Sequence, residues 1–119
     1  MSDLDRTLAA LADPHRRHAI DLLRERPRAA GELASALGLT PPAMSRHLRV
    51  LRQAQLVEEE RREDDARVRV YRLRRDRFDD LRAWIDEVES FWADQLGAFK
   101  EHAERTRGAK KGKKKKEAR

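Results

Sequence analysis

A row of arginines near the middle of the chain is the feature best suited to chemistry. Along one face of a predicted helix lie a proline, a serine and three arginines, namely Pro42, Ser45, Arg46, Arg49 and Arg52. They follow the spacing of a helix face, and no acidic residue occurs between positions 40 and 57. Guanidinium groups bind phosphates and guanine edges, so this face suits the major groove of duplex DNA. The alternative is a solvated helix face that binds nothing.

The residues before this row predict a tight turn between two helices. Residues 31–37 form a compact amphipathic helix, and Gly38 suits the left-handed position after it because glycine has no Cβ. Thr40 offers an oxygen as N-cap, and Pro41 fits the first helical position. The second helix, residues 41–54, has apolar residues at helical spacing on its buried side, at Met44, Leu48 and Leu51. A short glycine-containing turn between helices is typical of a helix-turn-helix, with the second helix as recognition helix.

Two further helices are predicted before this turn. A short first helix has leucines at helical spacing, at Leu4, Leu8 and Leu11. Asp13 can cap the next helix and Pro14 can open it, because a proline at the first position needs no N–H. This second helix covers residues 15–26 and ends at Pro27.

A β-hairpin and a long helix are predicted after residue 57. The hairpin has partly alternating strands at residues 57–62 and 67–73, joined by a polar turn at 63–66. Its arginines alternate with acids, so we expect some to form ion pairs and others to reach phosphate or the minor groove. The last helix runs from residue 75 to about residue 107 and carries almost all the aromatic residues. Their clustering indicates a core that a partner chain completes.

Together these elements predict a mainly α fold, a winged helix-turn-helix of α+β type with a long C-terminal dimerisation helix. Three stretches, LADPHRRHAIDLL, GELASALGLTPPAMSRHLRVLRQAQLV and RVRVYRL, closely resemble the ArsR family of bacterial transcriptional regulators in order and spacing. The resemblance covers roughly residues 4–99. It implies a homodimer that binds a partly palindromic operator and represses, usually at its own promoter, until an effector releases it. The family's first and last helices form the dimer interface, which implies interface roles for Leu4, Leu8, Leu11, Trp84, Val88, Phe91, Trp92, Leu96 and Phe99.

The predicted DNA contacts come from the recognition helix and from the wing. They are Thr40, Pro42, Ser45, Arg46, His47, Arg49, Arg52, Arg62, Arg67 and Arg69. Two of them have an alternative role. Thr40 can serve only as an N-cap, and His47, beside the buried stripe, can be a hydrogen-bonded structural residue.

The chain departs from the metal-sensing members of the family that it resembles. Those members carry a Cys-x-Cys pair in the helix corresponding to residues 32–37, and this chain has no cysteine. Other members use Asp/His and His/Glu pairs on the last helix, which this helix lacks. His15 and His18 are spaced for a shared ion, but two imidazoles without a third ligand make a poor site. We expect no metal and no cofactor, and the effector stays unknown.

The positive charge of the chain lies at its C-terminal end. The net charge is +6, and residues 108–119 alone hold six lysines and one arginine against one glutamate. Residues 1–107, the predicted single DNA-binding and dimerisation domain, are therefore neutral overall. Within them, residues 40–75 are basic and residues 76–107 are acidic. The tail has no packing residues, so we expect it to be disordered and to add salt-sensitive, sequence-independent DNA affinity. The alternative is a tail that only makes the chain more soluble.

These observations favour one function and leave one rival. The favoured function is a homodimeric DNA-binding repressor, and the rival is an architectural, nucleoid-type protein that coats DNA through its tail. An enzyme is not expected, because the sequence has no cysteine, no glycine-rich phosphate loop and no recognisable Ser/His/Asp arrangement. No apolar run approaches ~20 residues, and the polar start does not suit a signal peptide. We expect a cytoplasmic, nucleoid-associated protein without a membrane partner.

Overall fold

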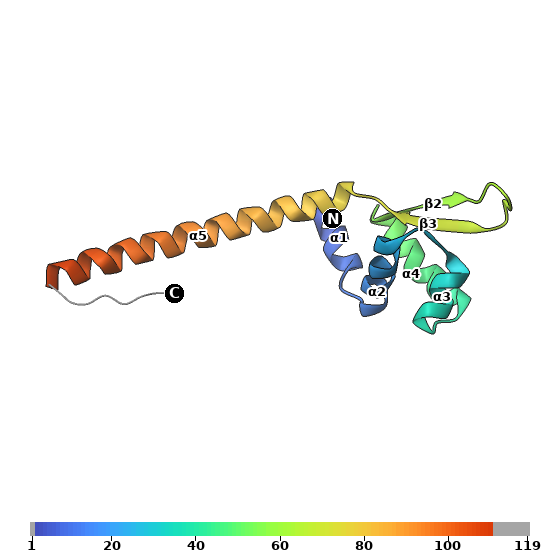
Figure 1. The fold of residues 1–119 in the computed structure, drawn as a ribbon, viewed down its shortest axis with the longest axis horizontal. Helices are drawn as coiled ribbons and strands as arrows, with labels where there is room; N and C mark the ends of the chain where they lie inside the picture. Colours follow the sequence, from blue (N-terminus) through green and yellow to red (C-terminus); the bar gives the residue numbers. More distant parts are fainter. Residues whose placement is uncertain (1, 111–119) are drawn as a thin grey trace. The chain divides into compact units, whose positions relative to one another are not determined.

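Five helices and three short strands make up residues 2–110, the part of the chain that the computed structural model describes (Figure 1). In order they are α1 (Asp3–Ala10), α2 (Pro14–Glu25), β1 (Arg28–Ala29), α3 (Ala30–Leu37), α4 (Pro41–Gln53), β2 (Val57–Arg61), β3 (Arg69–Leu73) and α5 (Asp76–Lys110). The chain divides into two compact units, Met1–Arg82 and Ala83–Arg119. The mainly helical composition with a small antiparallel sheet confirms the predicted fold class.

Side-chain caps set the starts of the first two helices. In α1, the hydroxyl of Ser2 accepts from the N–H of Asp5 at 3.1 Å, and the Asp5 carboxylate accepts from the N–H of Ser2. In α2, the Asp13 carboxylate accepts from the N–H groups of His15 at 2.8 Å and Arg16 at 3.2 Å. The predicted cap and proline start of α2 are therefore confirmed, and the capping box of α1 is an addition to the prediction.

The turn between α3 and α4 has the predicted chemistry. Gly38 adopts a φ of 68°, a left-handed conformation that favours glycine. The Thr40 hydroxyl accepts from the N–H of Ala43 at 3.3 Å, and Pro41 occupies the first helical position of α4. The start of α3 at Ala29 has no side-chain cap. Local residue types therefore account for where α3 ends and where α4 begins.

The three strands form one antiparallel sheet in the order β1-β3-β2. Strands β2 and β3 are the predicted hairpin, with Glu59 opposite Tyr71 and Arg61 opposite Arg69. Strand β1 was not predicted, because two residues have no alternation that a sequence can display. It forms where Arg28 lies opposite Tyr71, so that β3 is paired on both edges.

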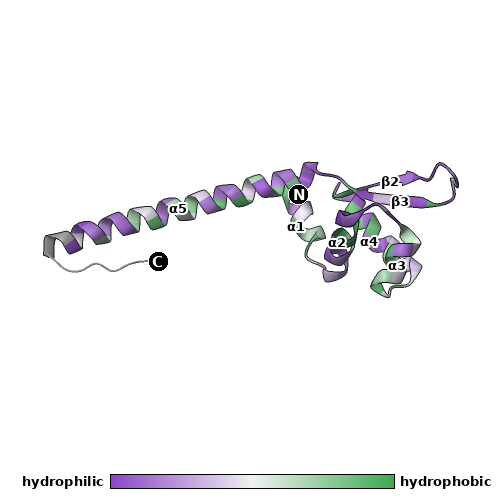
Figure 2. Cartoon of the chain, in the orientation of Figure 1, coloured by the Kyte–Doolittle hydropathy of each residue, from purple (hydrophilic) through white to green (hydrophobic). Residues whose placement is uncertain are grey.

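The core of the first unit lies between α2, α3, α4 and the sheet. Its largest fully buried apolar side chains are Leu33, Met44, Leu48, Leu51, Leu56 and Val57. This confirms the predicted buried stripe of α4, and it fixes which side of that helix faces outward. Figure 2 shows the loop between β2 and β3 as strongly hydrophilic, in contrast to the apolar segments of α2 and α4.

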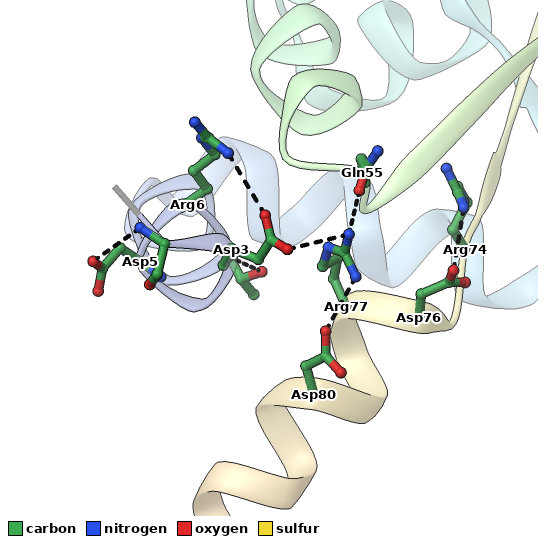
Figure 3. Close-up of polar contacts among 10 residues, drawn as sticks. Asp3, Asp5, Arg6, Gln55, Arg74, Asp76, Arg77 and Asp80 are labelled. Atoms are coloured by element: carbon green, nitrogen blue, oxygen red, sulfur yellow. Dashed lines mark hydrogen bonds and ion pairs between the residues drawn. The ribbon is translucent and has the colours of Figure 1, made fainter.

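Arg77 joins three segments of the first unit (Figure 3). Its guanidinium donates to the side-chain oxygen of Gln55 at 2.6 Å, and it pairs with Asp3 at 3.4 Å and with Asp80 at 3.1 Å. Gln55, in the turn after α4, has a positive φ of 63°. One side chain therefore ties the start of α1 and the first turns of α5 to the turn that follows α4.

The second unit contains the larger part of α5. This helix was predicted from residue 75 to about residue 107, and it ends at Lys110. It exposes a series of large apolar side chains, at Trp84, Ile85, Phe91, Trp92, Leu96 and Phe99. Within residues 2–110, every helix is too short or too polar to cross a membrane. The predicted disordered tail falls mostly on residues 111–119, which lie outside the described residues.

Candidate nucleic-acid interface

The outward face of α4 carries cationic and hydroxyl side chains. Because the apolar stripe of α4 is buried, the opposite face points into solvent, and Ser45, Arg46 and Arg49 are exposed on it together with Pro42. Within the described part of the chain, Arg46 and Arg49 have no carboxylate partner. Their guanidinium groups therefore keep all their donors for a ligand. Thr40 is also exposed at the start of this face, although its oxygen caps the helix.

Arg52 differs from the other arginines of this face because Glu59 holds it. Its guanidinium forms an ion pair with one carboxylate oxygen of Glu59, and Arg69 contacts the other oxygen at 2.9 Å. The Tyr71 hydroxyl donates to the same carboxylate at 3.2 Å. Burial alone would raise the pKa of Glu59, but the hydrogen bonds and charges of these partners outweigh it and lower the pKa. Two predicted DNA contacts, one from the helix and one from the wing, thus share one anion.

The arginines at the tip of the wing pair with neighbouring acids. Arg62 contacts both carboxylate oxygens of Asp64, with its Nε at 2.9 Å, and Arg67 contacts Asp65 at 3.1 Å. The hydrogen bond from Arg62 lowers the pKa of Asp64. These pairs confirm the expectation that part of the wing's charge is neutralised locally. Arg62 and Arg67 would have to exchange a carboxylate for a phosphate on binding DNA.

His47 faces α2. Its Nδ1 lies 3.3 Å from a guanidinium nitrogen of Arg16, and its ring centroid lies 5.6 Å from that of His15. Arg16 also donates to the carbonyl oxygens of Ala9 at 3.3 Å and Ala10 at 2.7 Å, which satisfies the last turn of α1. These contacts are the structural role that the sequence offered as the alternative to DNA contact.

The residues predicted for dimer contact occupy different environments. Leu8 is 42% exposed, whereas Leu4 is half-buried and Leu11 packs partly against the core of its own chain. On α5, Val88 is half-buried. The others are exposed, at Trp84, Phe91, Trp92, Leu96 and Phe99.

Sequence reasoning missed the residues that hold the arginines of this interface in place. Glu59 and Tyr71 did not stand out, because an acid and a tyrosine on opposite strands approach the arginine of a helix only after folding. The alternation of charge in the hairpin was the available indication. Within the described residues, no group of three or more His, Cys, Asp or Glu side chains is placed to hold a metal ion.

In sequence, the chain is similar to bacterial transcriptional regulators. The sequence model of the bacterial regulatory proteins of the arsR family matches residues 13–59. The chain is similar to the HTH-type transcriptional regulator Rv2034 of Mycobacterium tuberculosis, with 49% identity over 44% of this chain and 50% of the relative. It is 32% identical to the transcriptional repressor SdpR of Bacillus subtilis over 50% of this chain and 66% of the relative. The chain thus spans half to two thirds of the length of these relatives.

A solved structure resembles a larger part of the chain than the family model, which matches residues 13–59. The solution structure of the homodimeric winged helix-turn-helix DNA-binding domain of Mb0332 from Mycobacterium bovis superposes with a TM-score of 0.56 and 26% identity. The match covers 79% of this chain and 82% of that domain. Helix α4 and the hairpin therefore occupy the places of the second helix of the helix-turn-helix and of the wing in this fold.

Proposed function

The chain belongs to the ArsR family of bacterial regulatory proteins, and from this we propose that it is a homodimeric, sequence-specific DNA-binding transcriptional regulator. We further propose that it acts as a repressor at a palindromic operator, its own promoter being the first candidate. The observation that carries the proposal is the acid-free outward face of α4, whose free arginines Arg46 and Arg49 stand beside the hydroxyl of Ser45. Such a face can make bidentate contacts to guanine and phosphate in the major groove.

The homodimer is supported by the exposed apolar side chains of α5. Phe91 is 56% exposed, Leu96 63% and Phe99 70%, which is costly for side chains of this size in water. Pairing with a second copy would remove this surface from solvent. The homodimeric domain of Mb0332, which has the same fold, supports this choice of partner.

We also propose that the chain represses transcription and that it does not respond to a metal ion. The similarity to the repressor SdpR supports repression. The chain has no cysteine to supply a thiolate ligand, which supports an effector other than a thiolate-bound metal ion.

A footprint on the chain's own promoter tests the proposal. At ~150 mM salt, where long-range attraction by the tail is screened, we expect two protected half-sites about one helical turn apart. Replacement of Arg49 (Arg49→Ala) should weaken this binding by at least about 1 kcal/mol, because a bidentate contact is lost. Arg24→Ala, which removes an exposed arginine of α2, is the matched control and should not change the footprint. An equal loss of DNA affinity in both variants would refute the assignment of the outward face of α4 as the DNA-binding face.

An architectural protein is the second candidate, and the charge of the C-terminal tail favours it. The lysines and arginine of residues 108–119 account for the whole net charge. Deleting residues 110–119 separates the two functions. A repressor keeps its preference for one site without the tail, whereas an architectural protein loses nearly all its DNA affinity.

A further inference from the structure

A polar notch lies between α4 and the hairpin, inside the first unit. It has a volume of about 170 Å³, and it is lined by Ser45, Leu48, Arg49, Arg52, Arg69 and Tyr71. Three of these residues carry guanidinium groups and one carries an aliphatic hydroxyl. Leu48 contributes an apolar side chain to the wall of the notch. The notch opens on the same side of α4 as the proposed DNA face, because Ser45, Arg49 and Arg52 belong to that face.

The register of the hairpin determines which side chains reach the notch. Residues directly opposite each other in an antiparallel pair project from the same face, so Glu59, Tyr71 and Arg69 share one face. The contact of Glu59 with Arg52 shows that this face is turned toward α4. Arg72 lies opposite Glu58 on the other face, where it also pairs with Glu60 at 3.0 Å. The two faces of one hairpin thus carry the same kind of ion pair in two different places.

Glu59 holds the arginines of the notch in place without exhausting their donors. One nitrogen of Arg52 and one of Arg69 contact its carboxylate. A guanidinium has five N–H donors, so the remaining donors of both groups are free to bind a further anion. The Glu59 side chain is only 18% exposed, and the Tyr71 hydroxyl donates to it. These two constraints hold the carboxylate in one position.

We propose that this notch receives one phosphate of the DNA backbone, and that Glu59 is a positioning residue that orients Arg52 and Arg69 toward it. The proposal rests on the proposed DNA-binding function and names the backbone site between helix and wing. A phosphodiester presents two non-bridging oxygens that share one negative charge, and converging guanidinium groups on two sides of a small cavity match this arrangement. The single carboxylate of Glu59 offsets only one of the two positive charges of Arg52 and Arg69, so the pair keeps a net positive charge that favours an anion over a neutral base edge.

The first measurement is the salt dependence of binding to a random-sequence DNA duplex, which requires no knowledge of the operator. Each phosphate contact contributes about 0.9 to the slope of log K against log salt. Arg69→Ala should therefore lower the slope by about one per protomer. Arg72→Ala removes the same residue type from the opposite face of the same strand, and it should leave the slope unchanged. Arg69→Lys should restore much of the slope, since the charge returns.

The second measurement separates a positioning residue from an ordinary acid. An ordinary acid near DNA repels phosphate, so its neutralisation strengthens binding, and on the far face of the hairpin we expect Glu60→Gln to strengthen binding slightly or leave it unchanged. Glu59→Gln should instead weaken binding, because Arg52 and Arg69 lose their common anchor. Circular dichroism of each variant verifies that it is folded. Stronger binding by Glu59→Gln, or equal slopes for Arg69→Ala and Arg72→Ala, would overturn the proposal.

Inorganic phosphate distinguishes a DNA site from a site for a free anion. At constant ionic strength we expect it to leave the melting temperature of the chain unchanged. A rise that disappears in Arg69→Ala, with an unaltered DNA slope, would assign the notch to a free anion and contradict the DNA site. If the unaltered chain binds no duplex, the proposed function fails as well. If it binds duplex and only the variant pattern is absent, the notch proposal alone fails.

Discussion

At the scale of single residues, carboxylates hold many of the arginines of this chain and are themselves made more acidic by their partners. Glu32 accepts from Arg28 at 2.9 Å and from Arg26, and the hydrogen bond from Arg26 is the main cause of its lowered pKa. At Asp13, burial opposes the shift, but backbone hydrogen bonds at the start of α2 outweigh it and lower the pKa. Each of these acids is therefore more acidic in the folded chain than in an unfolded one.

This predicts that the folded chain loses stability in acid. A carboxyl with a lowered folded pKa stabilises the fold above its unfolded pKa, and this contribution is lost as the pH falls through the folded value. The ordinary values are 4.5 for Glu32 and Glu59 and 3.8 for Asp13, so the free energy of unfolding should fall below about pH 4.5. Urea unfolding at a series of pH values measures this.

A pair of substitutions assigns part of the acid effect to Glu32. Glu32→Gln should lower the stability at neutral pH and flatten its decline in acid, because the charge that stabilises the pair with Arg26 is gone. Glu63→Gln, at an exposed position of the wing, is the matched control and should keep the original pH profile. A profile that stays steep in Glu32→Gln would show that other groups cause the acid loss.

At the scale of elements, the turn between α3 and α4 sets the direction of the recognition helix. Gly38 has a φ of 68°, and a Cβ added there would meet no atom within 4 Å. Gly38→Ala should therefore cost about 1 kcal/mol through backbone strain alone. Gly31→Ala, inside α3 and equally free of contacts, should leave stability unchanged or raise it by up to about 1 kcal/mol. Urea unfolding of both variants compares them, and equal effects would contradict the left-handed cap.

Elements governed by local chemistry were predictable from the sequence, and elements that depend on distant partners were not. Thr40, Pro41 and Gly38 define helix ends through their own backbone preferences, so the helix-turn-helix was predicted. The capping box formed by Ser2 and Asp5 was detectable, since an acid follows a serine three residues later. Strand β1 could not be detected, because it exists only through the edge of β3.

The candidate site also contains residues that the sequence could identify and contacts that only the folded chain creates. The outward face of α4 follows from helical periodicity, so Arg46 and Arg49 could be singled out before the fold was known. The pairing of Arg52 and Arg69 with Glu59 joins residues from three elements, and sequence spacing carries no information about it. The same holds for Arg77, whose partners Asp3 and Gln55 lie far away in sequence.

At the scale of the whole molecule, the described fold leaves its largest apolar side chains in solvent. Trp92 is 58% exposed, so a charge at this position tests the proposed dimer directly. Trp92→Glu should convert a dimer into a monomer in sedimentation analysis, and it should abolish binding to a two-half-site operator. Ser90→Glu adds a negative charge on the opposite face of α5 and should leave the dimer intact. A dimeric Trp92→Glu would place the interface elsewhere.

If the proposed dimer forms, the exposed aromatic side chains of α5 would also make the abundance of the chain part of its regulation. If pairing covers them, dimers at low concentration form in proportion to the square of the amount of chain. Operator occupancy would then rise more steeply than expression, and it would fall more steeply on dilution at cell division. A repressor of its own promoter built in this way would restore its level sharply after each dilution, without any effector.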